Sequence, residues 1–167
     1  MSVRRLSIQR LTQQGFAGFG DVIETDGRSH YSINAGTAER YDDLAMVDVA
    51  AADGRPVVSI CRAAPNALPV HLRLMERHPL SSQAFIPLSS VPFLVVVAPA
   101  GDKLDLEKVS VFRSNGRQGV NYRRCTWHHP LLALERVCDF LIVDRAGPGE
   151  NCEEVSIADQ NLVVVEP

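Results

Sequence analysis

Several classes of protein are disfavoured by what this sequence of 167 residues lacks. Its longest hydrophobic run, residues 91–100 (VPFLVVVAPA), is too short to cross a bilayer as a helix. The N-terminal stretch MSVRRLSIQRLTQQG is basic, but no apolar segment follows it, so we expect no secretory signal. The net charge is −3, the basic residues form no stripe, and no helix-turn-helix is readable. We therefore expect neither nucleic acid nor a membrane as a partner.

Cysteine is also scarce. The four cysteines, Cys61, Cys125, Cys138 and Cys152, show no C-x-x-C spacing, which argues against a structural zinc site. Without a secretory signal, a disulfide framework is not expected either. The sequence therefore predicts a cytoplasmic protein with reduced thiols.

Long helical periodicity, internal repeats and linkers are missing as well, so we expect one domain over residues 1–167. Two short helical segments are predicted. In TQQGFAGFG, Thr12 is a suitable N-cap and Gly20 a stop, and in DLEKV, Asp105 can cap a single turn.

Most of the remaining sequence is typical of strands, because it consists of short stretches rich in Val, Ile, Phe and Leu, bounded by Gly, Pro, Ser or Asn. These stretches cover residues 55–63, 68–79, 81–89, 91–99, 109–113, 119–122, 127–134 and 138–145. The dipeptide Asn115-Gly116 suits a hairpin turn. Many strands with almost no helix between them predict an all-β fold, an antiparallel sandwich or barrel with short peripheral helices.

Two of these stretches, MERHPLSSQAF and TWHHPLLAL, place histidine beside proline in an apolar context. Side chains alternate between the faces of a strand. In the first stretch Glu76 and His78 share the parity of Leu72 and Leu74, so we expect them to point into the core. The opposite parity, with Met75 and Arg77, is expected at solvent or at a subunit contact.

In the second stretch His128 is favoured as the inward histidine, because its parity set is the more apolar. Pro130 weakens that argument, and His129 is left open between a site residue and a turn residue. A single histidine near a strand end is usually only hydrogen-bonded, and His30 and His71 are interpreted in that way. An inward carboxylate beside inward imidazoles, by contrast, is costly unless it is paired or binds a metal, so Glu76, His78 and His128 are candidates for a functional site.

The residues resemble a known family. The stretches GFGDVIET, INAGTAERYDDL, MERHPLSSQAFIPL, VVVAP, NGRQGVNYRRCTWHHPLLAL and DFLIVDR together are similar to bacterial ureidoglycolate lyase, also called ureidoglycolate hydrolase. The resemblance extends over about residues 15–145. It implies a cupin-like β-barrel or jelly roll, a homodimer, and a role in allantoin degradation and purine nitrogen metabolism, where ureidoglycolate is split into glyoxylate and urea.

The cupin motifs imply a set of four candidate metal ligands, with Glu76, His78 and Gln83 at the spacings of the first motif and His128 in the second. Glutamine brings no charge, and glutamate in place of histidine hardens the site toward metals that prefer oxygen. The resemblance therefore leaves open whether a divalent ion, Ni²⁺ or Mn²⁺, is bound or whether there is no cofactor. Cys125 is interpreted as packing rather than as a nucleophile.

Cleavage of ureidoglycolate requires removal of the hydroxyl proton, scission of the C–N bond and protonation of the departing nitrogen, without attack by water. Histidine suits both proton transfers, and Glu76 could be the base if burial raises its pKa. Tyr122 could donate a hydrogen bond or a proton. For the substrate carboxylate we expect Arg124, if no bulge interrupts its parity with His128, and Gln83, with His129 as a further candidate. The resemblance implies Asn34 and Arg40 as additional substrate-binding candidates.

Two rival functions are open. A hydrolase acting on the same substrate would release ammonia and carbon dioxide and would need water activated by a bound metal. A cupin that binds small acids without turnover would act as a sensor.

Overall fold

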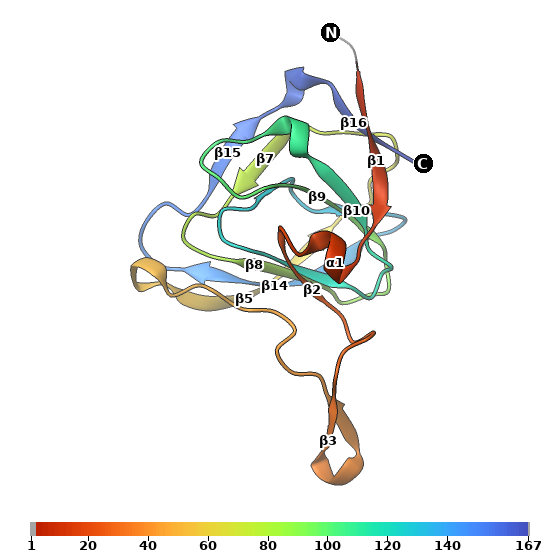
Figure 1. Cartoon of the computed structure of the whole chain (residues 1–167), viewed down its shortest axis with the longest axis vertical. Helices are drawn as coiled ribbons and strands as arrows, with labels where there is room; N and C mark the ends of the chain where they lie inside the picture. Colours follow the sequence, from red (N-terminus) through yellow and green to blue (C-terminus); the bar gives the residue numbers. More distant parts are fainter. Residues whose placement is uncertain (1–2, 167) are drawn as a thin grey trace.

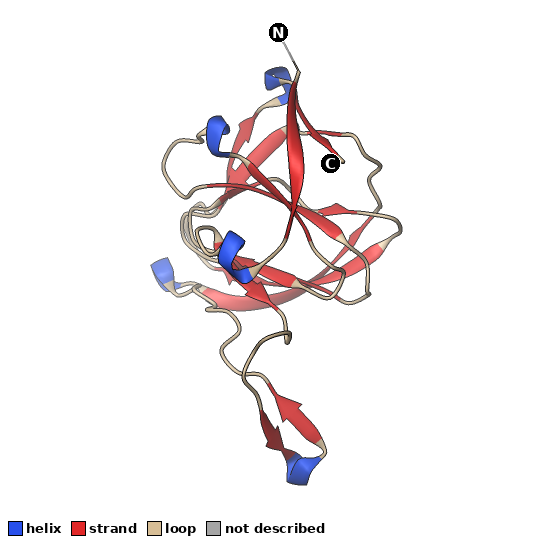
Figure 2. Ribbon diagram, turned by 45° about the vertical axis from the view of Figure 1, so that its right-hand side comes forward, coloured by secondary structure: helices blue, strands red, loops and turns tan. Residues whose placement is uncertain are grey.

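The computed structural model describes residues 3–166, which form two large β-sheets that curl around each other and a separate two-stranded hairpin (Figures 1 and 2). The strands of the larger sheet are β1 (Arg4–Arg10), β6 (Val70–His71), β7 (Leu74–Arg77), β9 (Phe93–Ala98), β10 (Ser110–Arg113), β12 (Trp127–His128), β13 (Leu132–Ala133), β15 (Glu153–Ser156) and β16 (Leu162–Val165). Their order is β15-β7-β12-β9-β10-β1-β16-β6, and β13 also pairs with β9.

The smaller sheet has the order β2-β11-β8-β14-β5. Its strands are β2 (Gly20–Ile23), β11 (Gly119–Tyr122), β8 (Gln83–Pro87), β14 (Cys138–Ala146) and β5 (Arg55–Ala63). The expected mainly-β, barrel-like architecture is confirmed, and it is consistent with a cupin-like fold. It is not wholly antiparallel, because β1 pairs in parallel with both β10 and β16.

The helices are short and lie at the periphery, as predicted. They are α1 (Gln13–Phe16), η2 (Ala51–Asp53), η3 (Leu106–Lys108) and η4 (Ala158–Gln160), with η1 in the hairpin described below. Thr12 caps α1 through its side chain, which accepts from the backbone N–H of Gly15, and Asp105 caps η3 by accepting from Glu107. Among the described residues, no helix is long and apolar enough to cross a membrane.

Strand β9 is the centre of the core, because all six of its residues are buried. Leu94, Val96 and Ala98 belong to one apolar cluster, which lies within the curled large sheet and includes Trp127. Phe93, Val95 and Val97 belong to a second cluster, which lies between the two sheets and includes Phe140. A strand buried on both faces reads as a continuous apolar run, as VPFLVVVAP does.

The expectation that Met75 and Arg77 of β7 face solvent or a subunit contact is wrong, because the core has two layers. Met75 is fully buried in the first cluster, and Arg77 is 7% exposed beside the Trp127 ring, with its guanidinium bound to Glu153, Asp102 and the Gly101 carbonyl. Parity within one strand separates its two faces, but it does not show whether a second layer covers the outer one.

The predicted hairpin at Asn115-Gly116 is wrong in part. The chain does turn there, with Gly116 at a φ of +87°. However, β10 pairs with β9 and β1, whereas β11 pairs with β2 and β8, so the turn joins the two sheets instead of closing a hairpin.

A hairpin of β3 (Tyr31–Ile33), η1 (Asn34–Gly36) and β4 (Ala38–Arg40), here called the arm, projects from the barrel (Figure 2). None of its residues is buried. It leaves the molecule on the side of the smaller sheet, after β2, and the chain returns across that sheet toward η2 (Figure 1).

The core layers predict a large difference between two substitutions. The side chain of Phe93 is fully buried, and its ring centroid lies 5.1 Å from that of Phe140. Phe93→Ala is therefore expected to lower the free energy of unfolding by about 3–5 kcal/mol. Val137→Ala, at a side chain that is 54% exposed, should change stability by less than about 0.5 kcal/mol. Urea unfolding followed by fluorescence of the single, buried Trp127 measures both, and equal losses would contradict the two-layer core.

Candidate active site

The pairing of β7, β12 and β9 places Glu76 and His128 side by side. His128 lies opposite Glu76 on one side and opposite Val97 on the other, so all three share the face that looks into the space between the sheets. His78 follows directly after the end of β7. The sequence prediction that Glu76, His78 and His128 point inward is confirmed: their side chains are 17%, 12% and 1% exposed.

The three side chains converge on one point. Oε1 of Glu76 lies 3.2 Å from Nε2 of His128 and 3.9 Å from Nε2 of His78, and the two imidazole centroids are 5.1 Å apart. The His128 contact is not aligned as a hydrogen bond, so the buried Nε2 of His128 has no hydrogen-bond partner among the described residues. A buried polar atom without a partner is unfavourable, and it marks a place where a proton, a substrate or an ion can bind.

Backbone carbonyls orient both imidazoles. Nδ1 of His78 lies 2.6 Å from the carbonyl oxygen of Asn151, and Nδ1 of His128 lies 3.0 Å from that of Thr126. Since a carbonyl only accepts, each Nδ1 carries the hydrogen, and each Nε2 is turned toward Glu76. This second contact fixes the tautomer and the ring orientation, as is common for histidines that bind metals or transfer protons.

Gln83, at the start of β8, adds a further oxygen beside His78. Its Oε1 lies 3.0 Å from Nε2 of His78, and its amide nitrogen donates to Oδ2 of Asp144 in β14 at 3.4 Å. With its nitrogen turned to Asp144, Gln83 can only accept from His78. Oxygen acceptors therefore face both nitrogens of the His78 ring.

Electrostatics keep Glu76 ionised. Burial raises the pKa of Glu76, but the contact with His128 and the charges of His128 and His78 outweigh burial, so that the pKa lies below its ordinary value. The expectation that burial makes Glu76 a base is therefore not supported. A carboxylate held in this form stabilises positive charge on its neighbours, and proton transfer falls to the imidazoles.

Tyr122 and His129 border the cluster. The Tyr122 ring is stacked on that of His128, with centroids 4.2 Å apart and planes at 12°. Burial and the charge of Glu76 raise the pKa of Tyr122, so the phenol keeps its proton and can act only as a hydrogen-bond donor or as packing. His129 is half-buried, its Nδ1 contacts the carbonyl of Pro130, and burial lowers its pKa, so it is mainly neutral near pH 7.

The donor set fits a divalent cation. Ligand atoms of Glu76, His78 and His128 all lie within 4.8 Å of one another. One carboxylate and two imidazoles, with an amide oxygen beside them, are a donor set used by first-row transition metals. The unpartnered Nε2 of His128 and the carbonyl-bound Nδ1 atoms are what a metal-ligating pair would show.

Known proteins similar to this chain agree with the motifs that carry the site. A family model described as ureidoglycolate lyase matches residues 3–165. Proteins named ureidoglycolate lyase from Pseudomonas putida (strain F1) and Stutzerimonas stutzeri are each 50% identical over 165 residues, covering 99% of this chain and 99% and 97% of theirs. One from Pseudomonas savastanoi pv. phaseolicola is 51% identical, over 99% of this chain and 97% of its own.

The chain belongs to the ureidoglycolate lyase family.

For this member of the ureidoglycolate lyase family, the predicted carboxylate-binding residues do not all lie at the cluster. Arg124 is in a turn between β11 and β12, where Cys125 has a φ of +64°, so strand parity does not extend from Tyr122 to His128. Its guanidinium pairs with Asp48 at 3.0 Å. The same turn supports the site differently, because the backbone N–H of Cys125 donates to the carbonyl of His78.

Asn34 and Arg40 are in the arm, and within the described part of this chain they form no hydrogen bond or ion pair with the cluster. Arg40 pairs with Asp42, and the carbonyl of Asn34 accepts from Thr37. His30 and His71, expected to have no functional role, are both exposed, and His30 lies beside Glu39 and Tyr41. The roles of Asn34 and Arg40 in substrate binding stay predictions.

The sequence reasoning missed three residues that surround His78: Asp144, Asn151 and Cys152. Together with His78, Ser81, Gln83 and Glu150 they line a cavity of about 290 Å³. Asn151 also binds Leu80 and Ser81 through its side chain, which fastens the loop before β15 to the turn after His78. Asp144 stands in an otherwise apolar strand, a signal that could have been noticed, whereas the loop around Asn151 has no periodicity to interpret.

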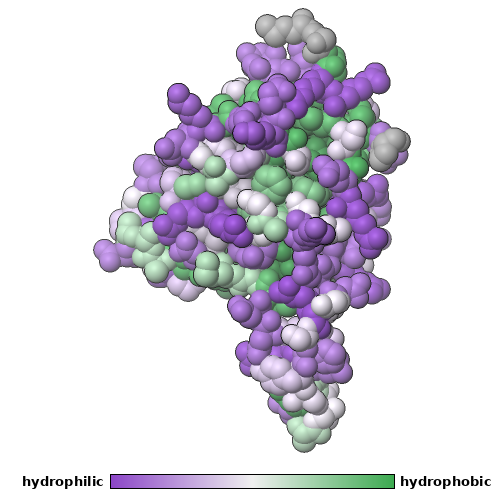
Figure 3. Space-filling model, in the orientation of Figure 1, coloured by the Kyte–Doolittle hydropathy of each residue, from purple (hydrophilic) through white to green (hydrophobic). Residues whose placement is uncertain are grey.

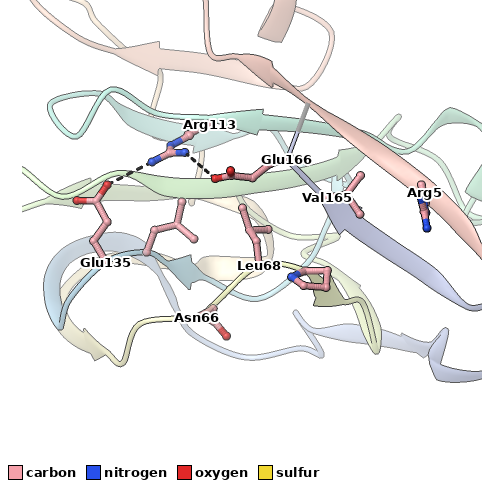
Figure 4. A pocket seen from close by; sticks show the side chains of 9 residues that line it. Arg5, Asn66, Leu68, Arg113, Glu135, Val165 and Glu166 are labelled. Carbon is pink, nitrogen blue, oxygen red and sulfur yellow. Dashed lines mark hydrogen bonds and ion pairs between the residues drawn. The ribbon is translucent and has the colours of Figure 1, made fainter.

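A larger cavity, of about 600 Å³, lies elsewhere, beside β1, β10 and β16 (Figure 4). Of the two arginines that line it, Arg5 and Arg113, the second is paired with Glu135 and Glu166. It holds none of the predicted site residues. We therefore assign the chemistry to the smaller cavity beside His78.

The lowered pKa of Glu76 predicts a pH-dependent contribution to stability. A folded pKa below the unfolded value means that the contribution is present above the unfolded pKa, near the ordinary 4.5, and is lost as the pH falls through the folded pKa. Glu76→Gln removes this pH-dependent contribution. The difference in unfolding free energy between wild type and variant should therefore shrink as the pH is lowered from about 7 to about 3. Urea unfolding after chelation measures this, with Glu150→Gln, exposed at the same cavity, as the control. A difference independent of pH would contradict the assignment.

Proposed function

We propose that this protein is a lyase that cleaves ureidoglycolate to glyoxylate and urea at the cluster of Glu76, His78 and His128. The main support for this proposal is that one ionised carboxylate and two oriented imidazoles converge beside a cavity. The chain that carries them belongs to the ureidoglycolate lyase family. Two imidazoles can divide the two proton transfers that the reaction requires.

The chemistry needs no water. One imidazole takes the hydroxyl proton of the substrate, the oxygen's electrons form the carbonyl of glyoxylate, and the C–N bond breaks. The departing nitrogen receives a proton from the second imidazole and leaves as urea. Glu76 stabilises the imidazolium formed on either side, Tyr122 holds His128 in plane by stacking, and Gln83 and Asn151 orient His78.

A divalent ion, Ni²⁺ or Mn²⁺, is the alternative occupant of this cluster, with Glu76, His78 and His128 as its ligands and Gln83 beside them. The two imidazoles would then hold the ion instead of carrying the protons. Such an ion would polarise the hydroxyl and carboxylate oxygens of the substrate as a Lewis acid. His129, which borders the cluster, is proposed to bind the substrate. Arg124, in the turn before β12, is paired with Asp48 and would have to exchange that carboxylate for the carboxylate of the substrate.

We propose further that the protein is a single cupin-like domain that acts as a homodimer in the cytoplasm, in allantoin degradation. All four cysteines, which lie within the described residues, are free, as suits a reducing compartment. An exposed apolar face on the smaller sheet, with Val58 and Ile60 more than half exposed, supports a contact with a second copy.

The products test the reaction. Purified protein with ureidoglycolate should form glyoxylate and urea in equal amounts, measured by a glyoxylate-coupled assay and by urease-dependent ammonia. Ammonia released without urease would favour the hydrolase, and ligand binding without turnover would favour a sensor. Either outcome would overturn the proposed lyase.

His128→Ala should reduce kcat by a factor of about 10²–10⁴, because it removes one of the two proton carriers. His71→Ala, an exposed histidine outside the cluster, is the matched control and should retain wild-type kcat. Calorimetric titration of both variants with Mn²⁺ and Ni²⁺ also tests the proposed ligand set, since only His128→Ala should lose affinity. Near-normal turnover in folded His128→Ala would remove His128 from the mechanism.

A further inference from the structure

We propose that Arg55, at the start of β5, binds the carboxylate of the substrate at the mouth of the cavity beside His78. The inference rests on the proposed function, because it assumes an anionic substrate. It goes beyond that function by naming the cation of the same chain that recognises the anion. Arg55 is not among the residues that the sequence predicted for the site.

The cavity beside His78 has no side-chain cation of its own. The described residues that line it include the carboxylates Asp144 and Glu150 but no lysine or arginine. A carboxylate substrate therefore meets negative charge here, and its recognition requires a cation from a neighbouring segment.

Most arginines of the neighbouring segments already have partners. Arg77 and Arg124 are paired with carboxylates, and Arg145 donates to backbone carbonyls. The side chain of Arg55, by contrast, is exposed and forms no hydrogen bond or ion pair within the described part of the chain. Arg124 would have to release Asp48 before it could bind the substrate, whereas Arg55 needs no such exchange.

Strand register places Arg55 on the face of the smaller sheet that the cavity occupies. In the pairing of β14 with β5, Asp144 lies opposite Val57, and Ala146 lies opposite Arg55. Asp144 also accepts a hydrogen bond from Gln83, so its side chain is on the cavity side of the sheet. Because side chains alternate between the faces of a strand, Ala146 and Arg55 share this side with Asp144.

This inner face changes from apolar to polar along the strands, and Arg55 is at its polar end. Phe140, of the same parity as Asp144, packs in the apolar cluster between the sheets. The outer face of β5 is apolar instead, with Val58 and Ile60 exposed, and Figure 3 shows hydrophobic side chains along the lower edge of the barrel, where Figure 1 draws β5 and β14. Arg55 therefore belongs to the polar surroundings of the cavity.

Arg55 is close enough to the cavity to act there. On paired strands, a residue two positions from the direct partner lies about 7–8 Å away, within reach of a long side chain. Arg55 has this diagonal position relative to Asp144. Directly opposite Arg55, Ala146 carries only a methyl group, so it does not block a side chain that crosses β14 toward the cavity.

The loop that completes the cavity, residues 147–152, is fastened beside Arg55. Gly147 approaches the turn before β5 so closely that a Cβ atom built on it would lie 2.9 Å from the Cα of Gly54. Arg145 donates to backbone carbonyls of both this loop and η2. The backbone of Arg55 is thus held at a fixed place beside the cavity wall, while its guanidinium is free to form a bidentate contact with a carboxylate.

Steady-state kinetics test this role. Arg55→Ala should raise the KM for ureidoglycolate about 10–100-fold with little change in kcat, because it removes a charge-assisted contact that serves binding. Arg55→Lys keeps the charge without the bidentate geometry, so its KM should lie between those of wild type and Arg55→Ala. The matched control is Arg62→Ala, at an exposed arginine on the opposite face of β5 that pairs with Asp139, and it should keep the wild-type KM. A wild-type KM in Arg55→Ala, or an equal rise in Arg62→Ala, would overturn the proposal.

Calorimetric titration separates this inference from the proposed function, because it needs no turnover. The wild type should bind glyoxylate more tightly than its neutral amide, and Arg55→Ala should lose affinity for glyoxylate alone. A wild type that forms no urea would refute the proposed function and leave this comparison valid. Equal binding of acid and amide by the wild type would contradict the inference, as would equal losses for both in Arg55→Ala. Loss of the preference for the acid in Arg124→Ala but not in Arg55→Ala would assign the carboxylate to Arg124 instead.

Discussion

The structure depends on one costly arrangement, the ionised carboxylate of Glu76 enclosed between two imidazoles. A buried charge is tolerated only when partners compensate for the water it has lost. His128 and His78 provide that compensation at 3.2 and 3.9 Å. The lowered pKa of Glu76 shows that their attraction exceeds the cost of burial. Removing either histidine would leave the carboxylate under-compensated, so the same contacts that prepare the chemistry also stabilise the barrel at this point.

This arrangement needs a rigid support, and the two-layer core provides it. Strand β9 is buried on both faces, and β12, which carries His128, pairs with β9 on one side and β7 on the other. The register of three strands therefore fixes the separation of Glu76 and His128. His78 lies beyond the end of β7, where no ladder holds it, and the contacts from Asn151, Gln83 and the Cys125 backbone take over that role.

The parts that could be predicted from sequence are those governed by local pattern. Alternation placed Glu76, His78 and His128 inward, and capping residues located α1 and η3 correctly. The alternation of side chains gave a wrong prediction for Arg77, which was expected at the surface but is covered by a second layer. It also gave a wrong prediction for Arg124, because a turn interrupts the strand there. Asp144 and Asn151 reach His78 only through long-range register and loop closure, which no single stretch encodes. The fold class follows from composition and strand density, whereas the parallel pairing of β1 depends on topology alone.

The charges of the cluster and of the cavity impose opposite demands. Glu76, Asp144 and Glu150 place negative charge beside the imidazoles, which favours a bound cation there. The same carboxylates repel an anionic substrate, and Arg77 and Arg124 are paired with carboxylates of their own. A site of this kind binds an anionic substrate only when a cation is added, and the cluster of Glu76, His78 and His128 is where a divalent ion would supply it.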